Sequence, residues 1–436
     1  MTKRTLLFLL LCHMVSLSAL AQFNCTVAGS SPVTLPLVCL IPVASRVQNP
    51  GTAGQPASVF NASFATQLTQ LPLPSSATGV VFVFDKALNE DVPLETLGPI
   101  LTDRPQTLGK KRLFVGFSFQ QFNFNSIDGI NMNSVPFVFQ SHTPTTGTPT
   151  QLQYVVQTER IAFKLDQYVI VGTYGLTDRL DVSVVVPIER VSIGVGQSSA
   201  GPGTEYIVNN PNTTTPTTTT ALFPIMAKAG TASGVGDVLL SGKYELYKGE
   251  RFHFTGGMFI RLATGDALNY LGSGAYGFNP FVVASYQWRI SPHARLGYIW
   301  NTSTVLIPAS TTPTGSTSTR LPGGFQYDLG ADMKVVQRVT AAADILGYQF
   351  QNSPVLVPGT TQIPNYVNGR NMPISVTGVE RLNASYTATD FSIGLKWKPF
   401  DKRNLLVYAN GLFQLNNVGM RSDPVPLLGL SYTFKP

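Results

Sequence analysis

Segments of about ten residues, in which apolar and polar side chains alternate, recur from residue 109 to the end of the chain. In residues 390–398, one face carries Phe391, Ile393, Leu395 and Trp397. Successive side chains of a β-strand point to opposite faces, so each such segment predicts a strand with one apolar and one polar face. A tilted strand that crosses a membrane needs about 9–11 residues. The repeated pattern therefore favours a membrane β-barrel.

The connections between these segments support a barrel over a soluble sandwich. Short polar turns alternate with long linkers, and outer-membrane barrels have short periplasmic turns and longer external loops. Three Thr/Pro-rich tracts (142–151, 211–220 and 308–319) all fall in long linkers. We expect twelve antiparallel strands, with fourteen as the alternative, at about 112–124, 159–174, 180–191, 235–247, 251–263, 278–289, 293–301, 324–336, 339–351, 388–398, 405–416 and 425–434.

The N-terminal region, up to residue 108, lacks this repeated pattern of alternating segments and turns. Lys3 and Arg4, the apolar residues 6–20 and the small-residue site at 19–21 predict a cleaved signal peptide over residues 1–21. We expect residues 22–108 to form a periplasmic or plug-like segment, and residues 109–436 to form the barrel. Cys25 and Cys39 remain after cleavage and predict a disulfide bond, because an exported chain meets an oxidising compartment.

Composition excludes several other classes of protein. Charged residues make up 12% of the chain, and no apolar run of about 18 residues follows the N-terminus, which excludes a helical membrane bundle. Lys and Arg are scattered, so nucleic-acid binding is not expected. We predict no metal or cofactor site and no enzymatic activity. His142 and His293 are interpreted as solvated loop or turn residues, and His253, near Ser241, as a packed histidine rather than a catalytic base.

If apolar side chains face lipid throughout, the polar face of each strand lines the lumen. In the first strand the apolar parity changes between Phe119 and Phe122, which predicts a β-bulge near Gln120 and Gln121. Candidate ligand contacts in an external loop are Thr264, Asp266 and Ser273. The predicted lumen-facing residues are Lys164, Asp166, Asp237, Lys243, Glu245, His253, Arg261, Arg295, Asp328, Asp332, Lys334 and Lys396.

An ordered set of short motifs resembles a known family. They are FSFQQFNFNSIDGI (117–130), YGLTDRLDV (174–182), GVGDV (234–238), RLATGD (261–266), LGSG (271–274) and SPHARLGY (291–298). Together they resemble the outer-membrane barrels catalogued as the "MetA-pathway of phenol degradation", which are distantly similar to fatty-acid and aromatic-hydrocarbon channels. The resemblance covers about residues 75–436 and implies an outer-membrane barrel that transports hydrophobic or aromatic compounds.

These observations lead to one expected function and one alternative. We expect a bacterial outer-membrane channel for passive passage or binding of small hydrophobic or aromatic compounds. The alternative is a structural or surface-interaction barrel that displays its Thr/Pro-rich loops. The expected partners are outer-membrane lipid, a small apolar or aromatic solute, and the barrel-assembly machinery, which would engage the C-terminal strand ending at Phe434.

Overall fold

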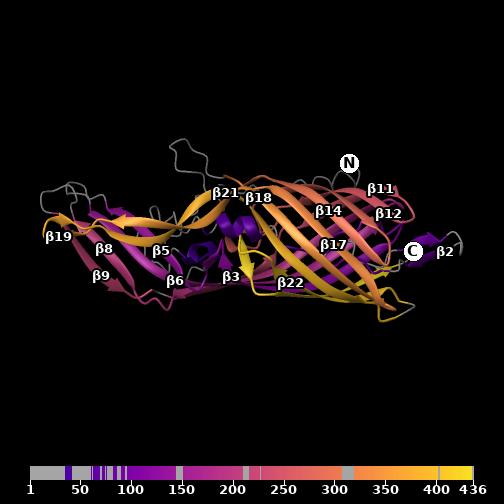
Figure 1. Cartoon of the computed structure of the whole chain (residues 1–436), viewed down its shortest axis with the longest axis horizontal. Coiled ribbons are helices and arrows are strands. Elements are labelled where there is room, and N and C mark those ends of the chain that lie inside the picture. Colours follow the sequence, from indigo (N-terminus) through magenta and orange to yellow (C-terminus); the bar gives the residue numbers. More distant parts are fainter. Residues whose placement is uncertain are drawn as a thin grey trace, which may run out of the picture.

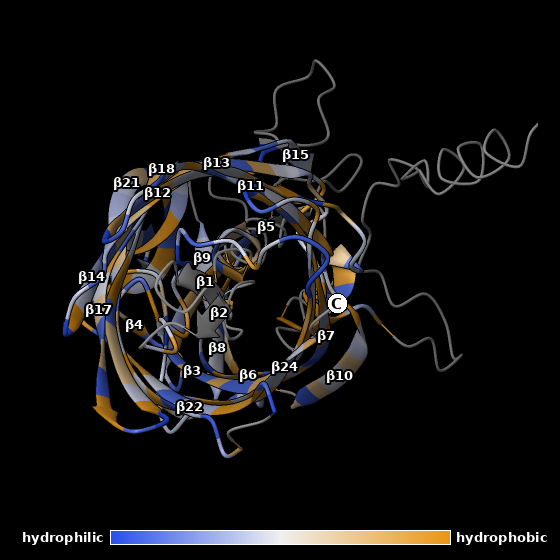
Figure 2. Cartoon of the chain, turned by 90° about the vertical axis from the view of Figure 1, so that its right-hand side faces the viewer, coloured by the Kyte–Doolittle hydropathy of each residue, from blue (hydrophilic) through white to orange (hydrophobic). Residues whose placement is uncertain are grey.

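Twelve antiparallel strands of the computed structural model close into a ring (Figure 2). The structure describes residues 35–41, 60, 62–68, 71–73, 75, 82–85, 90–93, 96–143, 151–209, 216–225, 227–306, 319–400 and 403–434. The ring contains β3 (Leu113–Ile127), β6 (Gln151–Gly175), β7 (Leu180–Gln197), β11 (Leu239–Lys248), β12 (Phe252–Arg261), β13 (Gly277–Tyr286), β14 (Ile290–Asn301), β17 (Gly324–Val336), β18 (Val339–Ile363), β21 (Ile374–Trp397), β22 (Leu405–Gln414) and β24 (Val425–Phe434).

The last strand closes the ring on the first. β24 pairs with β3 from Leu427 opposite Gln120 to Phe434 opposite Leu113. The expected twelve strands are confirmed. β1 (Phe82–Asp85) and β2 (Glu90–Pro93) pair only with each other in a separate sheet, so the alternative of fourteen barrel strands is wrong.

Three of the predicted long loops are largely β-structure. β6, β18 and β21 continue beyond the ring and, with shorter strands, build an extension at one end of the barrel (Figure 1). The shorter strands of the sheet are β4 (Ile130–Asn131), β5 (Val135–Thr143), β8 (Gly203–Asn209), β9 (Thr217–Phe223), β10 (Lys228–Val235) and β23 (Met420–Ser422). The described residues also form two small hairpins and two short 3-10 helices. The hairpins are β15 (Ser303–Thr304) with β16 (Thr319–Arg320) and β19 (Tyr366–Val367) with β20 (Arg370–Asn371), and the helices are η1 (Leu37–Cys39) and η2 (Ala267–Asn269). Short turns lie at the opposite, periplasmic end.

All twelve barrel strands expose large apolar side chains on the outer face of the ring. Aromatic residues gather near both ends of this belt. Phe278, Trp300, Phe325 and Phe413 lie toward the extension, and Phe252, Tyr286, Trp397 and Phe434 lie toward the short turns. Apolar bands flanked by aromatic girdles are typical of barrels that cross the outer membrane. Among the described residues, no helix has both the length and the apolar character required to cross a bilayer.

The polarity of the two faces inverts where the barrel leaves the membrane. On the outer face, the paired apolar residues Phe119 and Tyr168 are followed by the pair Gln121 and Asp166, whose side chains form a 2.7 Å hydrogen bond. Beyond that row, the interior becomes apolar and contains Phe122, Phe124 and Phe163, each at most 6% exposed. Above the membrane the outer face meets water, so the apolar side chains turn inward.

This inversion corrects two sequence predictions. β3 pairs with β6 in unbroken register from Leu113 to Phe124, so the predicted bulge at Gln120 and Gln121 is wrong. Lys164 and Asp166 alternate with buried Ile161, Phe163 and Leu165, so they lie on the outer face and not in the lumen. The change of apolar parity marks the end of the membrane and not a change of register.

Candidate functional site in the barrel lumen

Residues 96–108 run through the lumen and are held by two buried lysines of the wall. The Lys243 Nζ atom donates to the carbonyl oxygens of Arg104 and Gln106, both at 3.0 Å. On β21, the Lys396 Nζ atom donates to the carbonyl oxygen of Leu97 at 3.2 Å and to that of Pro99. A buried ammonium group is costly unless its protons are bonded, so these contacts fix both the lysines and the segment.

A histidine on β14 joins the same segment to the wall. The His293 Nε2 atom lies 2.6 Å from Asp344 Oδ1 and 3.0 Å from the Thr102 hydroxyl, while its Nδ1 atom lies 3.4 Å from Asp332 Oδ1. His293 is 6% exposed. The interpretation of His293 as a solvated turn residue is therefore wrong. The strand begins three residues earlier than predicted and points this side chain inward.

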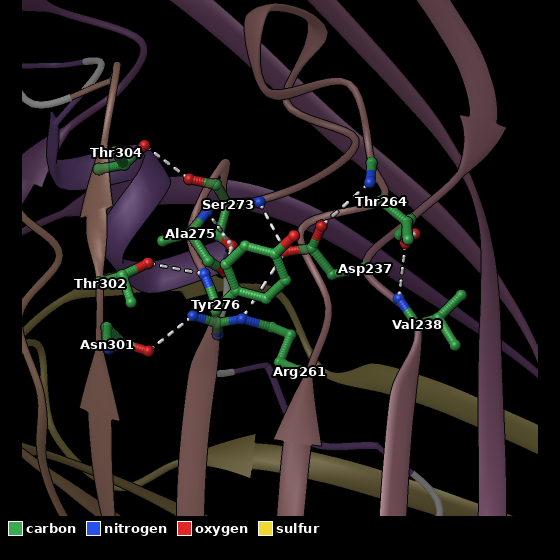
Figure 3. A network of polar contacts seen from close by, with 12 residues as sticks. Asp237, Val238, Arg261, Thr264, Ser273, Ala275, Tyr276, Asn301, Thr302 and Thr304 are labelled. Carbon is green, nitrogen blue, oxygen red and sulfur yellow. Dashed lines mark hydrogen bonds and ion pairs between the residues drawn. The ribbon is translucent and has the colours of Figure 1, made fainter. Parts of the chain in front are cut away.

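A second network holds the loop between β12 and β13 (Figure 3). The carboxylate of Asp237 accepts from the Gly265 amide at 3.1 Å and from the amide and hydroxyl of Ser273 at 2.8 and 2.5 Å. The Arg261 Nε atom lies 3.7 Å from Asp237 Oδ2, and its Nη2 atom donates to Asn301 Oδ1 at 2.7 Å. One buried carboxylate thus holds the start and the end of the loop.

The three loop residues expected to touch a ligand have different positions. The Thr264 hydroxyl donates to the Gly236 carbonyl at 2.8 Å, and Asp266 caps η2 by accepting from the Leu268 amide at 3.1 Å. Both therefore shape the loop. Ser273 lines the lumen cavity described below, so contact between Ser273 and a ligand stays a prediction.

A cavity of about 250 Å³ lies between residues 101–103 and the helical residues 62–68. Leu101 and Asp103 of the lumen segment, Ser75, and Ala65, Gln67 and Leu68 of the helical segment line it. Apolar lining comes from Phe259, Leu271, Ile299, Leu346, Phe350 and Met420. Charged lining comes from Asp103, Glu189, Asp237, Arg261, Arg295, Asp328, Asp390 and Arg421. About 150 Å³ is enough for a benzene ring, so this space fits a small aromatic molecule.

Each of the three arginines of the cavity is paired with a carboxylate, Arg261 with Asp237 as described above. The Arg295 Nη1 atom lies 3.1 Å from Asp328 Oδ2, and its Nε atom lies 3.9 Å from Asp103 Oδ2. Arg421 of β23 binds Asp390, with 2.8 Å between Nη1 and Oδ1. The lining thus holds five carboxyl groups and three guanidinium groups, and this balance does not favour an anion.

An aromatic cluster closes the extracellular side of the cavity. Phe64 of the helical segment contacts Phe163 and Tyr270, with ring centroids 4.8 and 5.8 Å apart. Phe60 contacts Phe137 at 5.5 Å. The helical segment is thus packed into the extracellular half of the barrel, between the wall and the loop of η2.

Asp128 joins this helical segment to three external elements. Asp128 and Gly129 both have positive φ and form the two-residue turn between β3 and β4, as expected for Asp-Gly in a type I′ hairpin. The Asp128 carboxylate accepts from the Leu356 amide at 2.8 Å and from the Gly419 amide at 3.2 Å. It also lies 3.5 Å from Gln67 Nε2. Burial raises the pKa of Asp128 to about 6, although these bonds oppose the increase.

Most of the predicted lumen residues point inward. Lys334 has inward parity but is exposed at the periplasmic end. His253 lies 2.7 Å from Glu245 through Nδ1 and Oε1. The residues found buried inside the ring are Asp237, Lys243, Glu245, His253, Arg261, Arg295, Asp328, Asp332 and Lys396. Within the described residues, no group of three or more His, Cys, Asp or Glu side chains could hold a metal ion.

Sequence reasoning missed the residues that come from outside the barrel strands. Thr102 and Asp103 lie in the segment 96–108, and Gln67 and Asp128 lie where the helical segment meets the turn between β3 and β4. One signal was available, because Asp103 and Arg104 are the two charged residues of the otherwise uncharged stretch 96–108. Cys39 is disulfide-bonded. Its expected partner Cys25 and the signal-peptide residues lie outside the described part of the chain.

The closed ring, its apolar belt and its polar, partly filled lumen define an outer-membrane β-barrel of the channel type. A protein-family model described as "MetA-pathway of phenol degradation" matches residues 139–353, which confirms the resemblance expected from the motifs. Comparison with curated protein sequences yields no match.

Similar solved structures are outer-membrane proteins. An outer membrane channel from Pseudomonas putida F1 is 13% identical with a TM-score of 0.44, and the alignment covers 76% of this chain and 99% of that chain. A FadL homologue from Pseudomonas aeruginosa is 11% identical with a TM-score of 0.28, covering 74% and 90%. The NanC porin is 12% identical with a TM-score of 0.29, covering 57% and 93%.

Proposed function

We propose that this barrel lets small hydrophobic or aromatic compounds cross the outer membrane by passive diffusion, and that it does not transform them. The observation that carries the proposal is the lumen cavity of about 250 Å³, whose wall contains many apolar and aromatic side chains. Such pockets, with a few polar groups among apolar ones, are typical of small-molecule sites. The family match supports the same class of solute.

The route would require the lumen segment to move. Leu101 and Asp103 of the lumen segment and Ala65, Gln67 and Leu68 of the helical segment all line the cavity, so both segments restrict access to it. A solute would enter from the extracellular side when the helical residues 62–68 shift, occupy the cavity, and leave when the segment 96–108 shifts. We therefore propose a plug role for this part of the predicted segment 22–108.

A cavity-filling substitution tests the proposal. Ala388 on β21 lines the cavity, whereas Ala409 on the neighbouring β22 is exposed on the lipid-facing side of the ring. Ala388→Phe should reduce uptake of a labelled one-ring aromatic compound by about tenfold, since a filled site loses roughly 1.4 kcal/mol or more of binding. Ala409→Phe adds the same ring outside and should leave uptake unchanged.

The assay uses cells whose outer membrane contains the full-length protein at matched amounts, with cells that lack it as the baseline. The solute recovered inside should be chemically unchanged. Wild-type uptake at the baseline rate, or equal uptake by both variants, would contradict the proposed channel. Altered solute would contradict the absence of catalysis.

A further inference from the structure

The outer face of β3, β6, β7 and β10 carries ordered rows of side chains at and just above the edge of the apolar belt. The last belt row contains Phe119, Tyr168, Ile188 and Val235. The next row contains Gln121, Asp166, Arg190 and Ser233, and the row above it contains Asn123, Lys164, Ser192 and Thr231. Neighbouring rows are about 7 Å apart, because each step along a strand is two residues. The first polar groups therefore lie at headgroup depth.

Small residues make a hollow above these rows. Ala162, Gly194 and Ala229 are paired across the three strands, and the hollow that they line has a volume of about 440 Å³. Without larger side chains in this row, the strand surface remains open between the residues above and below it. The hollow faces sideways from the barrel, on the same outer face as the belt.

Cationic side chains stand on both sides of the hollow. Lys164 is in the row below the small residues, and Arg160, paired with Gly196, is in the row above. Both line the hollow and Arg160 is exposed, while the Lys164 side chain is 43% exposed. The exposed Arg190 lies one row nearer the belt. Amide and hydroxyl groups of Asn123, Asn125, Asn133, Ser192 and Thr231 complete the polar lining.

Two carboxylates partly neutralise the positive charge around the hollow. Asp166 lies 3.3 Å from Lys164, between Oδ1 and Nζ, and also accepts from Gln121. Asp423 lines the hollow and accepts from the Asn125 amide at 2.9 Å. Three cations against two carboxylates leave a net positive face. Surface ion pairs of this kind are weak, so Lys164 can exchange Asp166 for a stronger anionic partner.

We propose that this hollow binds the phosphorylated sugar headgroup of an outer-leaflet glycolipid. Arg160 and Lys164 bind a phosphate by charge-assisted hydrogen bonds, since cationic nitrogen atoms are strong donors to phosphate oxygens. The amides and hydroxyls around the small residues bind the sugar hydroxyls. Its acyl chains lie along the belt over Tyr168 and Ile188, which form the first apolar row below the two polar rows.

The position of the hollow selects a membrane lipid over a soluble sugar phosphate. A ligand held here lies above the apolar belt, separated from it by the two polar rows, and only a lipid reaches the belt and gains free energy by covering it. The site is on the outer face of the wall, so it goes beyond the proposed passage of solutes through the lumen.

The test uses the purified full-length protein in detergent and native mass spectrometry. Bisphosphorylated lipid A is titrated against the wild type, and dephosphorylated lipid A and inorganic phosphate serve as separate probes. We expect one tightly bound lipid A, much weaker binding of the dephosphorylated lipid, and no competition from millimolar inorganic phosphate. Arg160→Ala with Lys164→Ala should weaken lipid A binding by more than about tenfold, given the strength of bonds to charged groups.

A charge-matched control is available at the other end of the barrel. Arg251 and Lys110 are both exposed near the periplasmic turns, so R251A/K110A removes the same charge far from the hollow and should bind like the wild type. Ala162→Glu keeps both cations but places a carboxylate in the hollow, and should also weaken lipid A binding. Heat-modified gel mobility verifies folding of each variant.

Three results would overturn the proposal. The first is wild-type affinity in both hollow variants, and the second is equal loss in R251A/K110A, which indicates a general charge effect. The third is displacement of lipid A by inorganic phosphate, which indicates a simple anion site.

Discussion

The ammonium group of Lys396 lies 3.2 Å from the carbonyl oxygen of Leu97, although the two residues are 299 positions apart in the chain. Lys396 is fully buried, and its second bond is to Pro99. A wall strand near the C-terminus thus holds the lumen segment that precedes the first barrel strand.

Lys396→Met should loosen this segment. The substitution keeps an unbranched side chain but removes two bonds to carbonyl oxygens, each worth about 1.5–3 kcal/mol when the donor is charged. Amide hydrogen exchange over residues 96–108 should then increase by more than about tenfold. Lys334→Met removes an exposed lysine and is the control. Unchanged exchange in Lys396→Met would show that the segment does not depend on this anchor.

Asp237→Ala should release the loop between β12 and β13. The change removes three hydrogen bonds to Gly265 and Ser273, and it leaves Arg261 buried without its carboxylate. Removing one partner of a buried ion pair costs about 3–5 kcal/mol. Hydrogen exchange should increase across residues 263–276, and the midpoint of thermal unfolding should fall.

Comparison with Asp266→Ala separates the loop anchor from general loop effects. Asp266 is a cap in the same loop, and exposed caps contribute about 1 kcal/mol. An equal effect of the two substitutions would contradict the central role of Asp237.

Asp128 should make stability depend on pH. Burial raises its folded-state pKa from 3.8 to about 6, so the folded protein binds this proton more tightly than the unfolded chain does. Its contribution to the free energy of unfolding is complete below about pH 4 and is lost as the pH rises through about 6.

The wild type should therefore lose stability between about pH 4 and pH 7 relative to Asp128→Asn, which cannot titrate there. The difference in midpoint of thermal unfolding between the two proteins, measured across this range, gives the contribution of the group. Parallel pH profiles would show that Asp128 is not the titrating residue.

Two glycines of the barrel wall should respond oppositely to alanine. A Cβ atom at Gly324 would lie 1.7 Å from the carbonyl oxygen of Gln349 on the paired strand, and backbone cannot easily move away. At Gly242 a Cβ atom meets nothing within 4 Å. Gly324→Ala should destabilise by about 1–3 kcal/mol, whereas Gly242→Ala should be neutral or stabilising by up to about 1 kcal/mol. Denaturant unfolding in lipid vesicles measures both, and similar values would contradict the predicted clash.

Alternation and loop lengths were enough to predict the ring of twelve strands. A membrane strand has a fixed length and a side-chain period of two, and both are visible in segments such as 390–398. The same period placed Asp237, Arg261 and Lys396 correctly in the lumen. These properties are local, so the order of residues alone contains them.

Only the tertiary structure decided which face of a strand is exposed to water, and which segments occupy the barrel lumen. Lys164 and Asp166 follow the same alternation as the membrane rows, yet they lie outside the barrel because the apolar face turns inward above the bilayer. The contacts of Thr102 with His293, and of Asp128 with Gly419 and Leu356, join residues between 191 and 291 positions apart. No short-range pattern encodes such pairs, because they form when a closed ring brings distant strands and an inserted segment together.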